Sequence, residues 1–463
     1  MSIFNKRNKK LEEIENEKDS KNICVASRIL SDGTIIEMVF DREDNSTALV
    51  VWKDGEFSIK KSYSIGDQKM IPYKSDKDFL QNDVVLFPSK PKEFGTQTDL
   101  IIEVQNFIHK YLSVSDFFER ICSYYVLFSW IYDDFNELPY LRCLGDYGTG
   151  KSRFLKAVGS ICYHPIFTSG ATTTSPIFRM LNDFRGTLIL DEADFKLSDT
   201  TAEIIKILNS GFAKGNPVLR CESSNKNFDV KTFNVFSPKL IATRRLFDDS
   251  ALESRMITED MNLNLPRKDI QINITDDFEE EALELRNKLL RFRFLMKGKS
   301  SLNTDYEDRS IEPRLNQIAV PLMSIIDDEN VVKEIQGYIK EYNNKIKTDR
   351  TLSYNYQIIE AICELKNNGC EKLTIGNIAN VFNKDLGDKE QVTSRKMGYL
   401  VKKILDLKTE KTRDGYVLSE ENNSKIEVLA KRYGIELKSE YVNDVNVVID
   451  EVKNEGLNGK PLF

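Results

Sequence analysis

The feature that most constrains the fold is a glycine-rich segment, GDYGTGKS, at residues 145–152. It fits the pattern GxxxxGK[ST], in which a loop closes around phosphate groups. An apolar run at 140–144 precedes the segment, and an amphipathic run at 154–158 follows it. A loop between a strand and a helix in this way is typical of a parallel α/β core, so the sequence predicts that fold class for the middle of the chain.

The residue types in this loop fit a nucleoside triphosphate. Glycines let backbone N–H groups approach the phosphates, and the helix N-terminus adds partial positive charge. Lys151 can reach the β- and γ-phosphates, and Ser152 can ligate Mg²⁺. We therefore predict that ATP and Mg²⁺ bind here. The predicted cofactor-binding residues are Gly145, Asp146, Tyr147, Gly148, Thr149, Gly150, Lys151, Ser152 and Arg153.

A second motif lies downstream, where the apolar run 187–190 ends in two acidic residues, Asp191 and Glu192. A carboxylate at the carboxyl end of a buried strand can hold Mg²⁺, and the next one can orient and deprotonate the attacking water. We predict Asp191 as a metal ligand together with Ser152, and Glu192 as the general base. The alternative is an ordinary strand with an acidic end, which the glycine loop upstream disfavours.

Two further segments are an apolar strand at 239–243 and the stretch 251–257. With them the sequence resembles AAA+ ATPases, in particular the mobile-element and phage replicative helicases related to minichromosome maintenance proteins and superfamily III helicases. The segments GDYGTGKS, LILDEAD and ATRRLFDDSALESR carry the resemblance, which covers roughly residues 139–330. It implies an AAA+ P-loop core followed by a helical lid.

The resemblance also implies roles for three residues beyond the two motifs. Thr243 would be sensor 1, which polarises the attacking water, although these families often carry Asn there. Arg255 would be the arginine finger offered to the nucleotide of a neighbouring subunit, and Arg244 and Arg245 nearby leave that assignment open. Arg314 would be the sensor 2 arginine of the lid. A site completed across an interface implies a homo-oligomer, expected to be a hexamer.

Two short β-type runs, 218–222 and 228–236, predict a hairpin with Lys226 near its tip. In the resembling helicases a hairpin at this place lines the pore of the ring. The resemblance therefore implies that Lys226 contacts the backbone of single-stranded DNA. The alternative is an exposed lysine in a turn.

The C-terminal part resembles a winged-helix domain, with three helices and a possible wing. Its third helix, predicted from about 391 to 406, carries an apolar stripe of Met397, Leu400, Val401, Ile404 and Leu405. Residues 384–413 hold nine Lys or Arg against five Asp or Glu, in a chain whose net charge is −7. We expect contact with double-stranded DNA there, with a protein-binding role as the alternative. The predicted contact residues are Arg395, Lys396, Tyr399, Lys402, Lys403 and Arg413.

The remaining regions follow from pattern changes along the chain. Short β-type runs with Asp-Gly turns predict a small antiparallel β domain, whose role as an inter-subunit collar or a nucleic-acid contact stays open. The predicted divisions are a charged leader at 1–21, the β domain at 22–95, helices packed on the core at 96–138, the AAA+ core at 139–262, the helical lid at 263–347, the winged helix at 348–436 and an acidic tail at 437–463.

Composition excludes several classes of protein. Seven cysteines without a CxxC pair disfavour a zinc site and a disulfide framework, and the presence of only two histidines disfavours a His-rich metal site and a His-based catalytic triad. No apolar run approaches the ~20 residues of a membrane span, so we expect a cytoplasmic protein with no membrane partner. The predicted function is an ATP-hydrolysing, ring-forming DNA helicase or replication initiator of a mobile element or phage. The alternatives are an AAA+ loader or remodeller without unwinding activity, and a nucleotide-gated DNA-binding switch.

Overall fold

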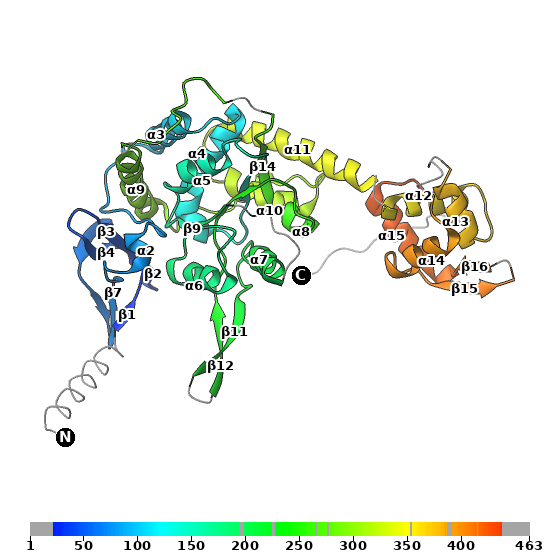
Figure 1. Cartoon of the computed structure of the whole chain (residues 1–463), viewed down its shortest axis with the longest axis horizontal. Coiled ribbons are helices and arrows are strands. Elements are labelled where there is room, and N and C mark those ends of the chain that lie inside the picture. The colour runs from blue at the N-terminus through cyan, green and yellow to red at the C-terminus, as the bar shows by residue number, and fades with distance from the viewer. Residues whose placement is uncertain are drawn as a thin grey trace, which may run out of the picture. The chain divides into compact units, whose positions relative to one another are not determined.

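The computed structural model describes most of the chain and divides it into two compact units, residues 1–341 and 342–463. The two units are described separately below, and Figure 1 draws their elements. The predicted leader, Glu192, Lys226 and nearly all of the predicted acidic tail lie outside the described residues. Those residues are 22–191, 193, 199–224, 227–263, 266–275, 277–351, 354–384, 386, 391–413 and 415–437.

A five-stranded parallel sheet forms the centre of the first unit, in the order β14–β8–β13–β10–β9. Its three inner strands β8, β13 and β10 are mostly apolar and buried, as expected for strands of a parallel sheet that is covered on both faces, whereas the edge strand β14 ends in three polar residues. This confirms the α/β core predicted from the sequence. The strands are β8 (Tyr140–Leu144), β9 (Ile166–Thr168), β10 (Leu188–Leu190), β13 (Lys239–Thr243) and β14 (Met256–Asp260).

Helices connect these parallel strands, so the carboxyl ends of all five strands lie at one edge of the sheet. The connecting helices are α5 (Lys151–Gly159), α6 (Thr174–Phe184), α7 (Asp199–Ser210) and α8 (Ser250–Glu253). Gly145, Asp191 and the strand-ending Thr243 therefore meet at the same edge, although the sequence separates them widely.

Helices on either side of the core in the sequence pack together. The aromatic-rich helix α4 (Asp116–Ile131) is buried around most of its circumference, as predicted. It packs against α3 (Gln97–Tyr111) and against α9 (Asp277–Met296) from the predicted lid region. The further helical elements are η1 (Tyr132–Asp134), η2 (Thr304–Tyr306), α10 (Pro313–Met323) and α11 (Glu329–Thr351).

The N-terminal region holds two sheets rather than one wholly antiparallel sheet. Strands β2–β5 form an antiparallel sheet, whereas β1 pairs in parallel with β7. The Asp-Gly signal is confirmed, because Asp54 and Gly55 have φ of 52° and 87°, which suits the two-residue hairpin turn between β4 and β5. The elements are β1 (Asn22–Cys24), β2 (Ser27–Ile29), β3 (Ile35–Asp41), β4 (Ser46–Lys53), β5 (Glu56–Lys60), β6 (Tyr63–Ile65), β7 (Gln68–Ile71) and α2 (Asp78–Gln81).

A buried ion pair joins this N-terminal region to the helices. Glu37 on β3 is 0% exposed and accepts hydrogen bonds from Arg293 Nε of α9 at 2.7 Å, Tyr163 Oη at 2.9 Å and Ser27 Oγ at 2.8 Å. Arg293 also donates to both carboxylate oxygens of Asp133, at 3.0 and 3.1 Å. Three segments far apart in the sequence therefore share one set of buried charges, which we name the Glu37–Arg293 network.

His164 lies next to the Glu37–Arg293 network, and its burial should make the stability of the folded protein depend on pH. Its ring is buried and stacks on Tyr163, and burial lowers its pKa to about 3. The unfolded chain binds a proton near pH 6.5 that the folded protein does not. The contribution of His164 to the free energy of unfolding should therefore fall as the pH drops from 6.5 towards 3, by up to ~1.4 kcal/mol per pH unit. Urea unfolding of the wild type and His164→Gln at several pH values checks this, and parallel pH profiles would contradict it.

The second unit has its own apolar core, built from helices and a small hairpin. Leu418 of the hairpin donates its N–H to the carbonyl of Leu373, which holds the hairpin to the segment before α13. Among the described residues, no helix is both long and apolar enough to cross a membrane. The elements are α12 (Tyr354–Asn367), α13 (Ile375–Phe382), α14 (Ser394–Lys403), β15 (Thr409–Thr412), β16 (Gly415–Leu418), η3 (Glu420–Asn422) and α15 (Asn423–Tyr433).

Two details of the predicted third helix need correction. Helix α14 ends at Lys403, so the helical periodicity no longer applies beyond it, and Ile404 is 48% exposed instead of buried. The other four residues of the predicted stripe are buried. The prediction also omitted the fourth helix, α15, which packs against α12.

Candidate nucleotide site

The glycine loop follows β8 and has a conformation that requires glycine. Gly148 and Gly150 have φ of 79° and 95°, the left-handed region that other residues rarely adopt. A side chain at Gly145 would place its Cβ 2.7 Å from Thr149 Oγ1 and 3.0 Å from Met261 Cβ. Gly150 is the N-cap of α5, so the loop leads directly to a helix N-terminus. This is the geometry in which backbone N–H groups can surround a phosphate.

Hydrogen bonds hold the loop in this shape. The Asp146 N–H donates to Asn262 Oδ1 at 2.8 Å, and Thr149 Oγ1 donates to the Asp146 carbonyl at 2.9 Å. Lys151 Nζ donates to the same carbonyl at 2.6 Å, so its ammonium group lies over the loop. The Lys151 ammonium group is therefore positioned to bind a phosphate that enters the loop.

The two predicted metal ligands are adjacent. Ser152 Oγ, in the first turn of α5, donates to Asp191 Oδ2 just beyond β10 at 3.0 Å. Both residues line a cavity of about 530 Å³. A hydroxyl and a carboxylate oxygen are ligands that Mg²⁺ prefers, so the residues fit the predicted metal. Glu192, the predicted base, lies outside the described residues.

Thr243 ends β13, the strand that lies between β8 and β10. Its side chain is 1% exposed, and its Oγ1 has no hydrogen-bond partner among the described residues. A buried hydroxyl without a partner costs about 1–3 kcal/mol. Such a cost is more readily explained at a site where a ligand or a water supplies the partner. The structure thus brings Thr243 to the same edge as the glycine loop and Asp191.

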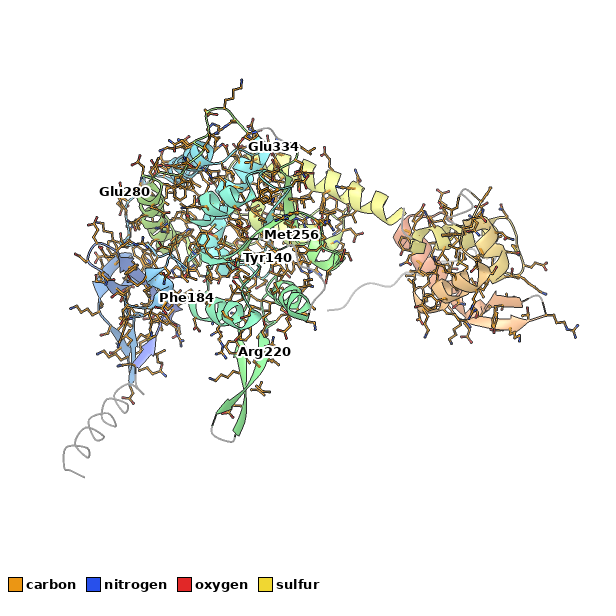
Figure 2. The ribbon with its side chains drawn as sticks, viewed as in Figure 1. Tyr140, Phe184, Arg220, Met256, Glu280 and Glu334 are labelled. Carbon is orange, nitrogen blue, oxygen red and sulfur yellow. The ribbon has the colours of Figure 1, made fainter. Side chains whose placement is uncertain are left out.

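The structure does not bring Arg255 or Arg314 to the glycine loop of their own chain. The Arg255 carbonyl accepts from the N–H of Tyr140, the first residue of β8, whereas the loop follows the last residue of that strand. Figure 2 shows Tyr140 beside Met256, the first residue of β14. Instead, the Arg255 and Arg314 guanidinium groups lie 5.1 and 4.9 Å from the ring of Phe212.

Arg255 is also 7% exposed and donates to Asn209 Oδ1 at 2.5 Å and to the Ala251 carbonyl. Burial, and then the charge of Arg314, lower the pKa of Arg255. By contrast, the neighbouring Arg244 and Arg245 are exposed. The burial of Arg255 therefore distinguishes it from Arg244 and Arg245, which the sequence left open as alternative arginine fingers.

Sequence reasoning missed several residues around the loop. Asn262 holds Asp146, and no motif marks it. Arg244 lies 5.7 Å from the ring of Tyr147, a loop residue that is 88% exposed. Arg153, which is predicted to bind the cofactor, donates to the carbonyls of Gln271 and Ile272 at 3.1 and 2.5 Å. Asn262, Gln271 and Ile272 belong to a segment after β14 that carries no sequence signature, whereas Arg244 was considered in the sequence only as an alternative arginine finger.

The structure confirms the predicted hairpin, with β11 (Val218–Ser224) and β12 (Asn227–Phe233) in antiparallel register. Figure 1 shows it projecting from the core of the first unit. In the second unit, Lys402 Nζ lies 4.9 Å from the ring of Tyr416 on β16. All the predicted contact residues of that unit are exposed, namely Arg395, Lys396, Tyr399, Lys402, Lys403 and Arg413.

Comparison with known proteins yields structural neighbours only. No protein-family model and no curated protein matches the sequence. The chain is similar to the apo structure of the NrS-1 C-terminal region, with TM-score 0.35 and 12% identity, over 83% of this chain and 95% of that chain. It is also similar to the JCV helicase, with TM-score 0.22 and 11% identity, over 52% of this chain and 65% of that chain. Similarities this weak do not establish a function for the chain.

Proposed function

We propose that this chain is a Mg²⁺-dependent ATPase of the AAA+ group that acts on DNA as a ring-forming helicase or replication initiator. One observation carries the proposal. The edge of a single parallel sheet brings together a glycine loop with its lysine, a Ser152–Asp191 pair and the buried hydroxyl of Thr243, which has no partner within the described part of the chain. The site thus has Lys151 to bind phosphate, Ser152 and Asp191 to bind a metal, and Thr243 to orient a water molecule.

The chemistry follows from these positions. Lys151 and the N-terminus of α5 bind the β- and γ-phosphates, and Ser152 with Asp191 would hold Mg²⁺, which neutralises charge on the phosphates. Glu192 would take a proton from a water whose oxygen attacks the γ-phosphorus. The bond from that phosphorus to the bridging oxygen then breaks, and ADP leaves with the electron pair. Thr243 Oγ1 would orient the water.

An arginine from a second copy would complete the site. Arg255 lies at the end of the sheet away from its own glycine loop, which suits a residue that acts on a neighbour's nucleotide. Arg314, the proposed sensor 2 arginine, lies beside the same Phe212 ring as Arg255. An arginine finger is worth ~10³–10⁵ in rate. Because Arg255 is bonded within its own chain, Arg244 and Arg245 remain alternative fingers. A homo-oligomer, which we take to be a hexamer, is therefore part of the proposal.

Two surfaces would contact DNA. The hairpin β11–β12, with Lys226 near the tip predicted from the sequence, would bind the single strand within the ring. The exposed face of α14 and the hairpin β15–β16 would bind the duplex in the manner of a winged helix, with phosphate contacts from lysine and arginine. This division supports a motor that loads on a duplex and moves along one strand.

The deciding experiment combines three measurements on the purified full chain with ATP and Mg²⁺. They are phosphate release with and without single-stranded DNA, strand displacement on a forked duplex, and the mass of the assembled particle. Displacement coupled to hydrolysis by an oligomer supports the proposal. DNA-stimulated hydrolysis without displacement favours a loader or remodeller, and slow hydrolysis that DNA leaves unchanged favours a switch. If the chain remains monomeric in the presence of nucleotide, the proposal of a ring-forming motor is wrong.

Thr243→Val tests the role of the buried hydroxyl. Valine has nearly the same shape, and the hydroxyl it replaces has no partner among the described residues, so the free energy of unfolding should not decrease. If the hydroxyl orients water, kcat for ATP hydrolysis should fall by roughly 10–100-fold with little change in KM. Steady-state kinetics and urea unfolding check both parts. Wild-type kcat in a stable variant would leave Thr243 as an ordinary strand residue.

A further inference from the structure

Lys239, the first residue of β13, is a buried lysine to which the proposed function assigns no role. Its side chain is 0% exposed, and its Nζ lies 4.6 Å from the centroid of the Tyr140 ring. Nζ donates to the carbonyls of Ser237, Gly211 and Val235 at 2.8, 3.2 and 3.4 Å. Among the described residues it forms no ion pair with a carboxylate. Because lysine is almost never fully buried unless it is paired, the contacts of this Nζ call for an explanation.

The three carbonyls belong to the two segments that connect the hairpin β11–β12 to the core. Gly211 directly follows α7 and leads towards β11, whereas Val235 and Ser237 follow β12. A side chain on Gly211 would place its Cβ 2.6 Å from Lys239 Nζ and 2.4 Å from the Val235 carbonyl oxygen, so this close approach requires glycine. The backbone adds one longer hydrogen bond between the segments, from the Ser237 N–H to the Gly211 carbonyl at 3.4 Å. Lys239 therefore joins the two ends of the hairpin to each other.

The end of α7, which Lys239 contacts, also contacts Arg255. Asn209 Oδ1, in the last turn of α7, accepts a hydrogen bond from Arg255 at 2.5 Å. The buried ring of Phe212, two residues after α7, lies 5.1 Å from the Arg255 guanidinium. Lys239 and Arg255 are thus bound to one short segment, residues 209–212, at the end of the sheet away from the glycine loop.

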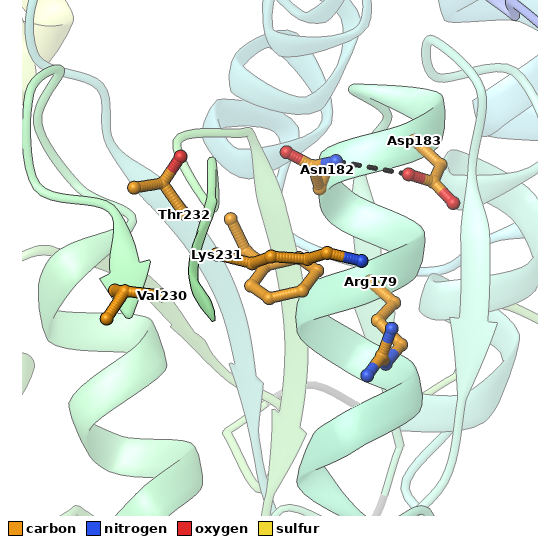
Figure 3. A pocket seen from close by; sticks show the side chains of 7 residues that line it. Arg179, Asn182, Asp183, Val230, Lys231 and Thr232 are labelled. Carbon is orange, nitrogen blue, oxygen red and sulfur yellow. Dashed lines mark hydrogen bonds between the residues drawn. The ribbon is translucent and has the colours of Figure 1, made fainter. Parts of the chain in front are cut away.

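A second anchor attaches the hairpin to α6. A cavity of about 520 Å³ lies between β12 and α6, and Figure 3 shows Asn182 of α6 among the residues that line it. Asn182 Oδ1 accepts the N–H of Asn234, the residue after β12, at 3.0 Å. This anchor holds the same hairpin without the segment 209–212, so it serves as the comparison for Lys239.

We propose that Lys239 is a positioning residue that couples the hairpin β11–β12 to Arg255. Displacement of the hairpin by single-stranded DNA moves the segment 209–212 through the contacts of Lys239 Nζ. Arg255, which is bonded to this segment, moves with it and changes the arginine that the subunit offers to its neighbour. The inference rests on the proposed action on DNA, and it names a buried residue through which DNA stimulates hydrolysis.

Lys239→Met tests this coupling, because methionine keeps an unbranched apolar side chain and removes Nζ. The measurements on the full chain are binding of a fluorescent ATP analogue, binding of a fluorescein-labelled oligo-dT, and phosphate release with and without oligo-dT. Both affinities should stay at their wild-type values, since Lys239 is buried and lies at the opposite end of β13 from Thr243. The stimulation of turnover by oligo-dT should fall by roughly 2–30-fold, the range for one substitution between two coupled sites. A merely structural residue would instead change the affinities and both turnover rates together.

Two further variants make the test specific to this connection. Asn209 is partly exposed, so Asn209→Ala should leave the fold intact. It removes the acceptor of Arg255 and should reduce the stimulation as Lys239→Met does. The double variant Lys239→Met/Asn209→Ala should lose no more stimulation than the more affected single variant, because both changes break one connection. Asn182→Ala, which removes the anchor to α6, is the matched control and should keep wild-type stimulation.

The outcomes separate this inference from the proposed function. If oligo-dT stimulates Lys239→Met and Asn209→Ala as much as the wild type, the coupling through Lys239 is wrong and the proposed function stands. The same conclusion follows if Asn182→Ala loses as much stimulation as Lys239→Met, since any loosening of the hairpin would then be sufficient. If Lys239→Met does not fold, Asn209→Ala against Asn182→Ala decides. A wild type whose turnover oligo-dT leaves unchanged overturns both the proposed motor and the coupling.

Discussion

Lys151→Ala should lower kcat/KM for ATP hydrolysis by at least about 10²–10³-fold. The Lys151 ammonium lies over the glycine loop, 2.6 Å from the Asp146 carbonyl, where it can stabilise charge that develops on the transferred phosphate. Removal of one preorganised donor of this kind costs that order of magnitude in other enzymes. Phosphate release under steady-state conditions measures the effect.

The matched control for this variant is Lys333→Ala. Lys333 is on α11, its side chain is 71% exposed, and it forms an ion pair at 3.8 Å with Glu329 in the same helix. We expect wild-type kinetics from it, and both variants should unfold at the same urea concentration as the wild type. Near-normal turnover in Lys151→Ala would show either that a contaminating ATPase hydrolyses the ATP or that the glycine loop does not bind the triphosphate.

Arg293→Met should lower the free energy of unfolding of the first unit by about 3–5 kcal/mol. The guanidinium is 1% exposed and bonds to Glu37, which is 0% exposed, and to Asp133. Its removal leaves a carboxylate buried without its cation, and the desolvation of that charge is then uncompensated. Both tryptophans, Trp52 and Trp130, lie in the first unit, so their fluorescence during urea unfolding reports that unit.

Two comparisons make the stability prediction specific. Arg120→Met breaks an exposed ion pair, with Arg120 at 2.8 Å from Glu334, and should cost less than about 1 kcal/mol. The double variant Glu37→Met/Arg293→Met should lose less stability than the two single variants together, because it leaves no unpaired member of that pair. Additive losses would show that packing, and not the charge pair, determines the cost.

The sequence predicts those parts of the molecule whose signals are local. The glycine loop, the strands around it and the hairpin β11–β12 each arise from a short run of residues with its own pattern. The exposed face of α14 follows for the same reason. The register of the sheet then brings Asp191 and Thr243 to the loop, because parallel strands align their carboxyl ends.

The parts that could not be predicted depend on contacts between distant segments. Glu37 and Arg293 look like surface charges in the sequence, and only the packing of β3 against α9 buries them. Likewise, β1 pairs in parallel with β7 although every turn signal between them favours antiparallel neighbours. The place of Arg314 beside Phe212 depends on how α10 folds back, which periodicity within α10 does not determine.

Strand β14 connects the glycine loop with Arg255. It begins directly after Arg255, and it ends just before Met261 and Asn262, which contact the glycine loop. The hydrogen bonds between β14 and β8 hold β14 in an extended conformation of fixed length. A displacement of the loop on loss of the γ-phosphate would therefore be transmitted along β14 as a rigid rod to the arginine at its far end. In the proposed oligomer, this strand would link hydrolysis in one subunit to the arginine that the subunit offers to its neighbour.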